Sequence, residues 1–163
     1  MKISTIAFSA CLGLAAATAV HAGAGAPGHT HGGKGGVTAF GQPGDPKMPA
    51  RLVLVSANEG NGEMTFSPAS IQVRTGEQIR FKIANHGELD HEFVIGTPAE
   101  IAEHAELMKK FPEMEHEDPS ATRMKTKGTS EILWKFSKPG DFVFACLIPG
   151  HMEGGMSGKI AVK

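Results

Sequence analysis

From residue 51 onward, hydrophobic and polar residues alternate in short runs that are separated by turn-forming residues. The alternation is clearest in Ile71–Arg74 and in Gln78–Ile83, on either side of Thr75-Gly76-Glu77. A period of two is typical of strands that bury one face. The pattern predicts strands at 51–55, 64–66, 71–74, 78–83, 91–95, 132–136, 142–145 and 159–162.

Residues 97–110 carry a helical pattern instead. Thr97 and Pro98 form a helix start, and Glu100 lies at the offset of a capping box. The loop predicted to follow covers 111–128. The residues expected on the buried face of the helix are Ile101, His104, Ala105 and Met108.

Short strands with one helical interruption predict an all-β fold, a Greek-key β-sandwich with a helical insertion at 97–128. The sandwich is expected to span 51–163. The preceding segment, 23–50, has nine glycines and four prolines among 28 residues. Such a composition buries little apolar surface, so we expect a flexible tail there.

The first 22 residues resemble an export signal. Lys2 precedes an apolar run from Ile3 to Val20, and Val20-His21-Ala22 offers a small-residue cleavage site. We expect cleavage after Ala22; a retained anchor is the alternative. No later apolar stretch approaches the roughly 20 residues that span a bilayer. The sequence therefore predicts a periplasmic protein that is peripheral to the membrane at most.

Charge adds little to this prediction. Without residues 1–22 the chain carries 15 basic and 17 acidic side chains, a net charge of −2. Such a balance gives no reason to expect nucleic-acid binding. About 140 residues suit one domain, and we expect a monomer.

Cysteine usage gives the first chemical signal. Beyond the predicted cleavage site only Cys146 remains, in a compartment where thiols normally form disulfides. It is either a buried apolar residue, a thiol that pairs between chains, or a metal ligand. Four residues separate Cys146 from His151, and four more separate His151 from Met156. A soft thiolate, imidazoles and a weak axial thioether are what copper prefers, so the loop favours a metal ligand.

Such a site needs a second histidine. His91 opens a predicted strand, which would hold it rigidly, whereas the competing His86 lies in a turn. Zinc is the alternative metal, but zinc sites prefer four firm tetrahedral ligands and a thioether is a poor one. We therefore predict one Cu(I)/Cu(II) ion per chain. The predicted ligands are His91, Cys146, His151 and Met156.

Residues 51–163 resemble the cupredoxins, a family that includes plastocyanin, azurin, auracyanin and rusticyanin. The resemblance lies in Phe66-Ser67-Pro68, Gly76-Glu77, Asn85, His91–Ile95 and the loop 146–156, whose spacing is most similar to rusticyanin and auracyanin. It implies the same four ligands and a redox-active type 1 copper. It also implies a docking surface beside His151, although ordinary loop packing explains the same residues. The residues concerned are Leu147, Ile148, Pro149 and Met152.

Histidines in the tail and methionines in the insertion also resemble the small periplasmic cupredoxins of the CopI copper-tolerance type. We therefore favour copper tolerance, with a redox or copper-handling protein as partner, over a one-electron carrier. An enzyme such as a nitrite reductase or a multicopper oxidase is disfavoured, because it needs further copper sites and domains. The candidate auxiliary copper ligands are His29, His31, Met108, Met114, His116 and Met124.

Overall fold

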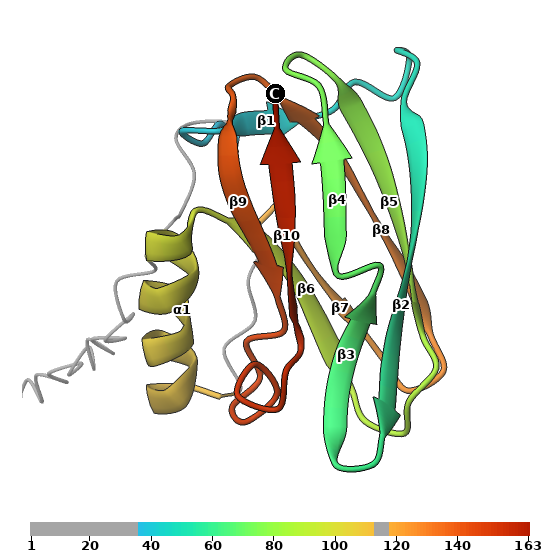
Figure 1. The fold of residues 1–163 in the computed structure, drawn as a ribbon, viewed down its shortest axis with the longest axis vertical. Coiled ribbons are helices and arrows are strands. Elements are labelled where there is room, and N and C mark those ends of the chain that lie inside the picture. The colour runs from blue at the N-terminus through green and yellow to red at the C-terminus, as the bar shows by residue number, and fades with distance from the viewer. Residues whose placement is uncertain (1–35, 113–117) are drawn as a thin grey trace, which may run out of the picture.

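In the described part of the chain, two five-stranded sheets pack face to face, with one helix at the side of the sandwich (Figure 1). This computed structural model describes residues 36–112 and 118–163. The predicted signal peptide and the first part of the predicted tail lie outside the described residues. The predicted all-β sandwich with a helical insertion is confirmed.

The two sheets mix parallel and antiparallel pairs. The first sheet has the order β1 (Gly41–Pro43), β8 (Thr129–Phe136), β5 (Gln78–Asn85), β2 (Arg51–Gly60) and β3 (Glu63–Ser67). The second has the order β4 (Ser70–Val73), β10 (Ser157–Val162), β9 (Gly140–Ala145), β6 (His91–Gly96) and β7 (Ala121–Met124). β2 runs parallel to β5 and β4 parallel to β10, whereas the other pairs are antiparallel.

The core between the sheets is rich in aromatic side chains. On β5, Ile79, Phe81 and Ile83 are fully buried, as the period of two predicts. Phe93 of β6 stacks on Phe144 of β9 with ring centroids 5.0 Å apart. Phe144 comes two residues before Cys146, so this stacked pair supports the strand that carries the cysteine.

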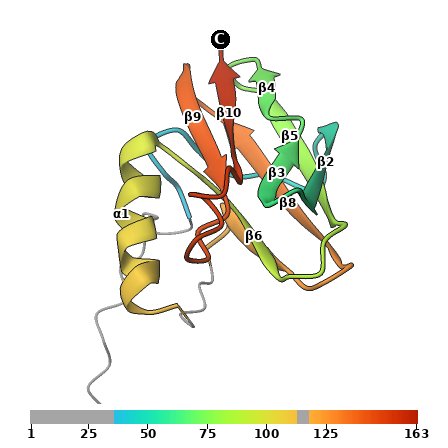
Figure 2. The ribbon, with the colours of Figure 1, turned by 60° about the horizontal axis from the view of Figure 1, so that its bottom comes forward.

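Strand β6 departs from alternation, because all six of its residues are buried. Phe93 and Ile95 face the main core, whereas Val94 packs with residues of the helix. Helix α1 (Pro98–Lys110) therefore covers the outer face of β6 and β9, as Figure 2 shows.

The capping box predicted for α1 is present. The Thr97 hydroxyl accepts a hydrogen bond from the Glu100 backbone N–H, and the Thr97 N–H donates to the Glu100 carboxylate at 2.8 Å. The helix buries the predicted face, and Lys109 and Lys110 stand in its last turn, where cations suit the helix dipole. The buried residues are Ile101, His104, Ala105 and Met108.

Two segments differ from the prediction. Phe40 is buried and packs on Trp134 at a centroid distance of 5.3 Å, and β1 pairs with β8. The sandwich therefore begins before residue 51, because one aromatic side chain anchors a segment that is otherwise rich in glycine and proline. Part of the predicted loop at 111–128 forms β7, which pairs with β6. Its short sequence, Ala121–Met124, carries little alternation.

Candidate metal centre

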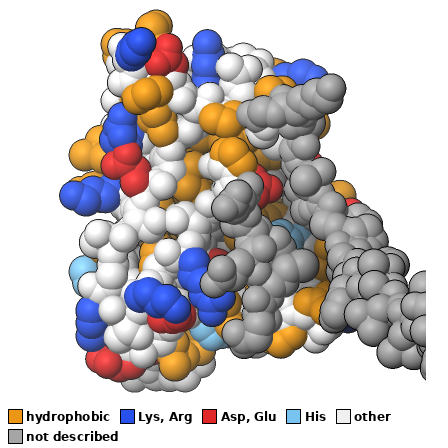
Figure 3. Space-filling view, turned by 180° about the vertical axis from the view of Figure 1, so that it is seen from behind, with side chains coloured by type: hydrophobic (Ala, Val, Ile, Leu, Met, Phe, Trp, Pro, Cys, Tyr) orange, Lys and Arg blue, Asp and Glu red, His pale blue; other side chains and the backbone are white. Residues whose placement is uncertain are grey.

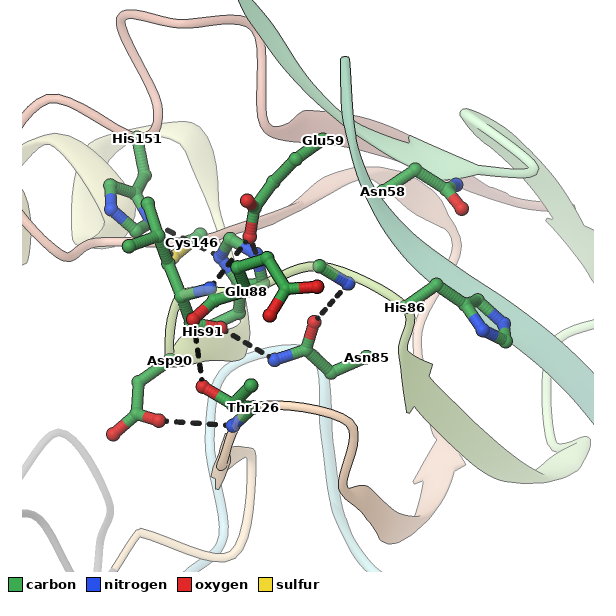
Figure 4. A network of polar contacts seen from close by, with 12 residues as sticks. Asn58, Glu59, Asn85, His86, Glu88, Asp90, His91, Thr126, Cys146 and His151 are labelled. Atoms are coloured by element: carbon green, nitrogen blue, oxygen red, sulfur yellow. Dashed lines mark hydrogen bonds and ion pairs between the residues drawn. The ribbon is translucent and has the colours of Figure 1, made fainter.

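Three donor side chains converge at one end of the sandwich. His91 opens β6, Cys146 directly follows β9, and His151 lies in the loop before β10. One possible ligand atom from each lies within 4.8 Å of the others, and all three residues are buried. The structure therefore brings together three of the four predicted ligands, and it brings His91 there instead of the competitor His86. Figure 4 shows His86 pointing away from this cluster.

The donor atoms of the three residues face one another. Nδ1 of His91 lies 3.1 Å from Nδ1 of His151, and the Cys146 Sγ lies 3.4 Å from the same His151 nitrogen. One sulfur and two imidazole nitrogens around a common point form a donor set that suits copper or zinc.

Met156 is placed next to these donors by the backbone. Its N–H donates to the His151 carbonyl at 3.0 Å, and its carbonyl accepts from the Cys146 N–H at 3.0 Å. The Met156 side chain is fully buried in the same cluster as Cys146. A thioether is a weak ligand that copper tolerates axially and that zinc seldom uses, so Met156 as a fourth donor would suit copper better than zinc.

Internal hydrogen bonds fold the loop between Cys146 and Met156. The His151 N–H donates to the Ile148 carbonyl, and the Gly154 N–H donates to the Gly150 carbonyl. Gly150 and Gly155 have φ angles of 89° and 102°, a region that favours glycine. The loop therefore holds His151 and Met156 in place through its own turns.

Burial shapes the chemistry of the cysteine. The backbone N–H of Glu92 donates to the Cys146 sulfur at 3.3 Å, but burial dominates and raises the pKa of the Cys146 thiol to about 12. A bound cation would displace this proton, because metals bind the thiolate form. Burial also raises the pKa of the Glu92 carboxyl, with Arg123 acting in the opposite direction.

Burial, together with the nearby His91, lowers the pKa of His151. The neutral imidazole is the form that binds a metal. The other nitrogen of His91, Nε2, lies 2.9 Å from Oε1 of Glu59, a residue that the sequence analysis missed (Figure 4). A hydrogen bond from the Leu89 N–H is the main reason that the pKa of Glu59 lies below its usual value. Glu59 lies between the predicted strands at 51–55 and 64–66, and no pattern in that segment indicates this contact.

The predicted auxiliary copper ligands are placed only in part. Met124 pairs with His91 across β7 and β6 and is buried in the main core. Met108 is fully buried between α1 and the sandwich. The structure thus packs both methionines among apolar side chains. The other four candidates lie outside the described residues: His29, His31, Met114 and His116.

The apolar surface predicted beside His151 is smaller than expected. Leu147 is only 2% exposed and packs with the buried face of α1, so it is not available to a partner. Ile148 and Met152 are half-buried, and Pro149 is exposed. Of the four residues predicted for a docking surface, these three remain accessible beside the edge of His151.

The face seen from behind mixes side-chain types. Seen from behind, hydrophobic, acidic and basic side chains are interspersed (Figure 3). Within the described ranges, α1 is too short and too polar to cross a bilayer, and no other helix there could do so.

Comparisons with known proteins agree with the site. Residues 53–163 match the model of the family of copper binding proteins of the plastocyanin/azurin type. The chain is 48% identical over 126 residues to the copper-resistant cuproprotein CopI of Rubrivivax gelatinosus, a match that covers 77% of this chain and 74% of that protein. It is 30% identical to the protein of the same name in Pseudomonas aeruginosa, with 77% and 83% covered.

Among solved structures, auracyanin B superposes with a TM-score of 0.62 at 19% identity, over 76% of this chain and 96% of auracyanin. At this identity the likeness shows a shared fold. The family match covers both the strand that opens with His91 and the loop from Cys146 to Met156. The chain therefore belongs to the plastocyanin/azurin family of copper-binding proteins.

Proposed function

We propose that this protein acts in copper resistance in the periplasm, and that it holds one redox-active type 1 copper at His91, Cys146, His151 and Met156. The observation that carries the proposal is the convergence of three buried donors within 4.8 Å from two separate segments. The names of the two relatives described above support the role in copper resistance.

The surroundings of the site suit a copper that changes oxidation state. His91 and Cys146 are held by paired strands, and the loop after Cys146 is folded by its own hydrogen bonds. Ligands held in this way move little when the charge of the metal changes. Copper would supply the one-electron step, while the chain supplies orientation, burial and the Glu92 N–H at the sulfur.

A one-electron carrier is the second candidate. His151 is 8% exposed, so a small edge of a proposed ligand reaches the surface beside half-buried Ile148 and Met152. Such an edge is where an electron could pass to a partner. Both functions share the copper site, and they differ in what the cell gains from it.

The first experiment is a Cu(II) titration of the chain without residues 1–22, followed by visible absorption. We expect an intense thiolate-to-copper band that saturates at one copper per chain and is absent from Cys146→Ser. A chain that binds copper without this band would contradict the proposed ligand set.

A growth assay separates the two functions. In cells that lack the native protein, the wild-type chain should restore growth on copper and Cys146→Ser should not. Equal copper tolerance with and without the wild-type chain would contradict the role in resistance and favour the carrier.

A further inference from the structure

We propose that Glu59 is a positioning residue of the copper site, which holds His91 with its proton on Nε2 and its Nδ1 free for the metal, and which favours Cu(II) over Cu(I) by its charge. The inference rests on the proposed ligand role of His91.

The two nitrogens of His91 face different partners. Nε2 lies 2.9 Å from Oε1 of Glu59, whereas Nδ1 lies 3.1 Å from Nδ1 of His151, on the side of Cys146. An ionised carboxylate can only accept a hydrogen bond, so Nε2 carries the proton and donates it to Glu59. Nδ1 of the neutral ring then has a free lone pair, directed at the point where the three donors meet.

Because His91 is buried, its contact with Glu59 determines the hydrogen bonding of Nε2. The His91 side chain has no exposed surface, so bulk water does not compete for either nitrogen. Glu59 is 21% exposed and reaches the ring from the end of β2, in the opposite sheet. The contact therefore joins the two sheets at the site.

The segment before His91 is built around the Glu59 carboxylate. The Leu89 N–H donates to the same Oε1 at 3.0 Å. A Cβ added at Gly87 would lie 1.9 Å from that oxygen, so only glycine leaves room for the carboxylate there. A side chain at position 87 would therefore push the Glu59 carboxylate away from its place beside His91.

Asn85 in turn holds this segment. Its side-chain amide donates to the carbonyls of Leu89 at 2.7 Å and Lys125 at 3.1 Å, and its Oδ1 accepts from the Gly87 N–H at 2.9 Å. Asn85 is 2% exposed. The carboxylate of Glu59 is thus fixed from both sides, by His91 and by a braced segment of backbone.

Among the described residues, no lysine or arginine forms an ion pair with Glu59. The two nearby lysines pair elsewhere: Lys125 with Asp90 and Lys127 with Glu88. A negative charge on the far side of an imidazole makes the ring a stronger electron donor, and the more highly charged Cu(II) gains more from this than Cu(I) does. Glu59 is therefore expected to lower the reduction potential.

The test compares Glu59→Gln with Glu88→Gln. Both variants remove one negative charge at this end of the molecule, but the Glu88 side chain is 77% exposed and forms its ion pair with Lys127 instead of with His91. Mutation of the residue that contacts a metal-ligating histidine from behind typically costs 10- to 100-fold in metal affinity or activity. We expect Glu59→Gln to weaken Cu(II) relative to Cu(I) by about ten-fold, which raises the potential by about 59 mV. Glu88→Gln should shift it far less.

The second readout needs no copper. Nitrogen-15 NMR of the histidines in the metal-free protein should show His91 protonated on Nε2 in the wild type, and a mixture of tautomers in Glu59→Ala. Protonation of wild-type His91 on Nδ1, or equal shifts of the potential in Glu59→Gln and Glu88→Gln, would overturn the inference. Failure of the copper site itself would appear separately, as loss of the thiolate-to-copper band in the wild type.

Discussion

The backbone N–H of Met64 donates a hydrogen bond of 3.0 Å to the carbonyl of Gly154, and so ties the β2–β3 hairpin to the loop that carries His151 and Met156. The same hairpin provides Glu59, whose carboxylate contacts His91. One hairpin of the first sheet therefore braces two of the proposed ligand-bearing segments, which both belong to the second sheet.

Gly155→Ala should weaken this brace. The residue has a φ of 102°, and an added Cβ would lie 3.3 Å from the Met64 carbonyl oxygen. Gly150→Ala is the matched control, because its φ of 89° is also strained but its Cβ would meet nothing within 4 Å. We expect backbone strain to cost each variant about 1–3 kcal/mol, with the larger loss in Gly155→Ala. Thermal unfolding of the metal-free proteins measures this, and equal losses would contradict the role of the Met64 contact.

Met108→Ala separates packing from copper binding. Met108 is fully buried between α1 and the sandwich, and such truncations typically cost about 2–5 kcal/mol because they leave a cavity. We expect a loss of stability in that range and no change in the number of copper ions bound. A normal stability with less copper per chain would instead identify Met108 as an auxiliary ligand.

Much of the sandwich could be predicted because its strands bury one face. The period of two in β5 identified the strand, and the capping box at Thr97 identified the start of α1. β1 and β7 escaped prediction for a physical reason. Their stability comes from pairing with distant strands and, for β1, from the burial of Phe40, and a short sequence shows neither.

Some residues of the site could likewise be identified from the sequence, and others could not. Cys146, His151 and Met156 lie in one loop, so their spacing could be read directly from the sequence. Glu59 could not be found, because its role depends on a contact with His91 across 32 positions and between two sheets. The sequence also could not decide whether Leu147 belongs to a docking surface or to internal packing, because nothing nearby shows that α1 covers it.

Ile148→Lys should distinguish a docking surface from ordinary packing. Ile148 is half-buried, and its backbone carbonyl accepts the His151 N–H, so the two residues are neighbours in the loop. Electron self-exchange between Cu(I) and Cu(II) copies, measured by NMR, requires their exposed His151 edges to meet. With Ile148→Lys in both copies, the exchange should slow by about ten-fold or more, because the two lysines repel each other where the copies meet. An unchanged rate, with an unchanged absorption spectrum, would show that electrons leave by another surface.

Glu77→Gln should lower the free energy of unfolding at neutral pH. It should also make that free energy fall less steeply as the pH is lowered. Glu77 pairs with Arg51 at 2.6 Å and accepts the Arg74 N–H, and the ion pair with Arg51 is the main reason that its pKa lies below its usual value. A carboxyl with a lowered folded-state pKa stabilises the fold above its unfolded pKa of about 4.3, and this contribution is lost as the pH falls through the folded-state pKa. Arg51 is 43% exposed, so we expect no more than about 1 kcal/mol at pH 7. Denaturant unfolding of the metal-free chain from pH 7 down to pH 3 measures it. The wild type and Glu77→Gln should differ at pH 7 and converge in acid, whereas a constant difference would show that the carboxylate charge is not the cause.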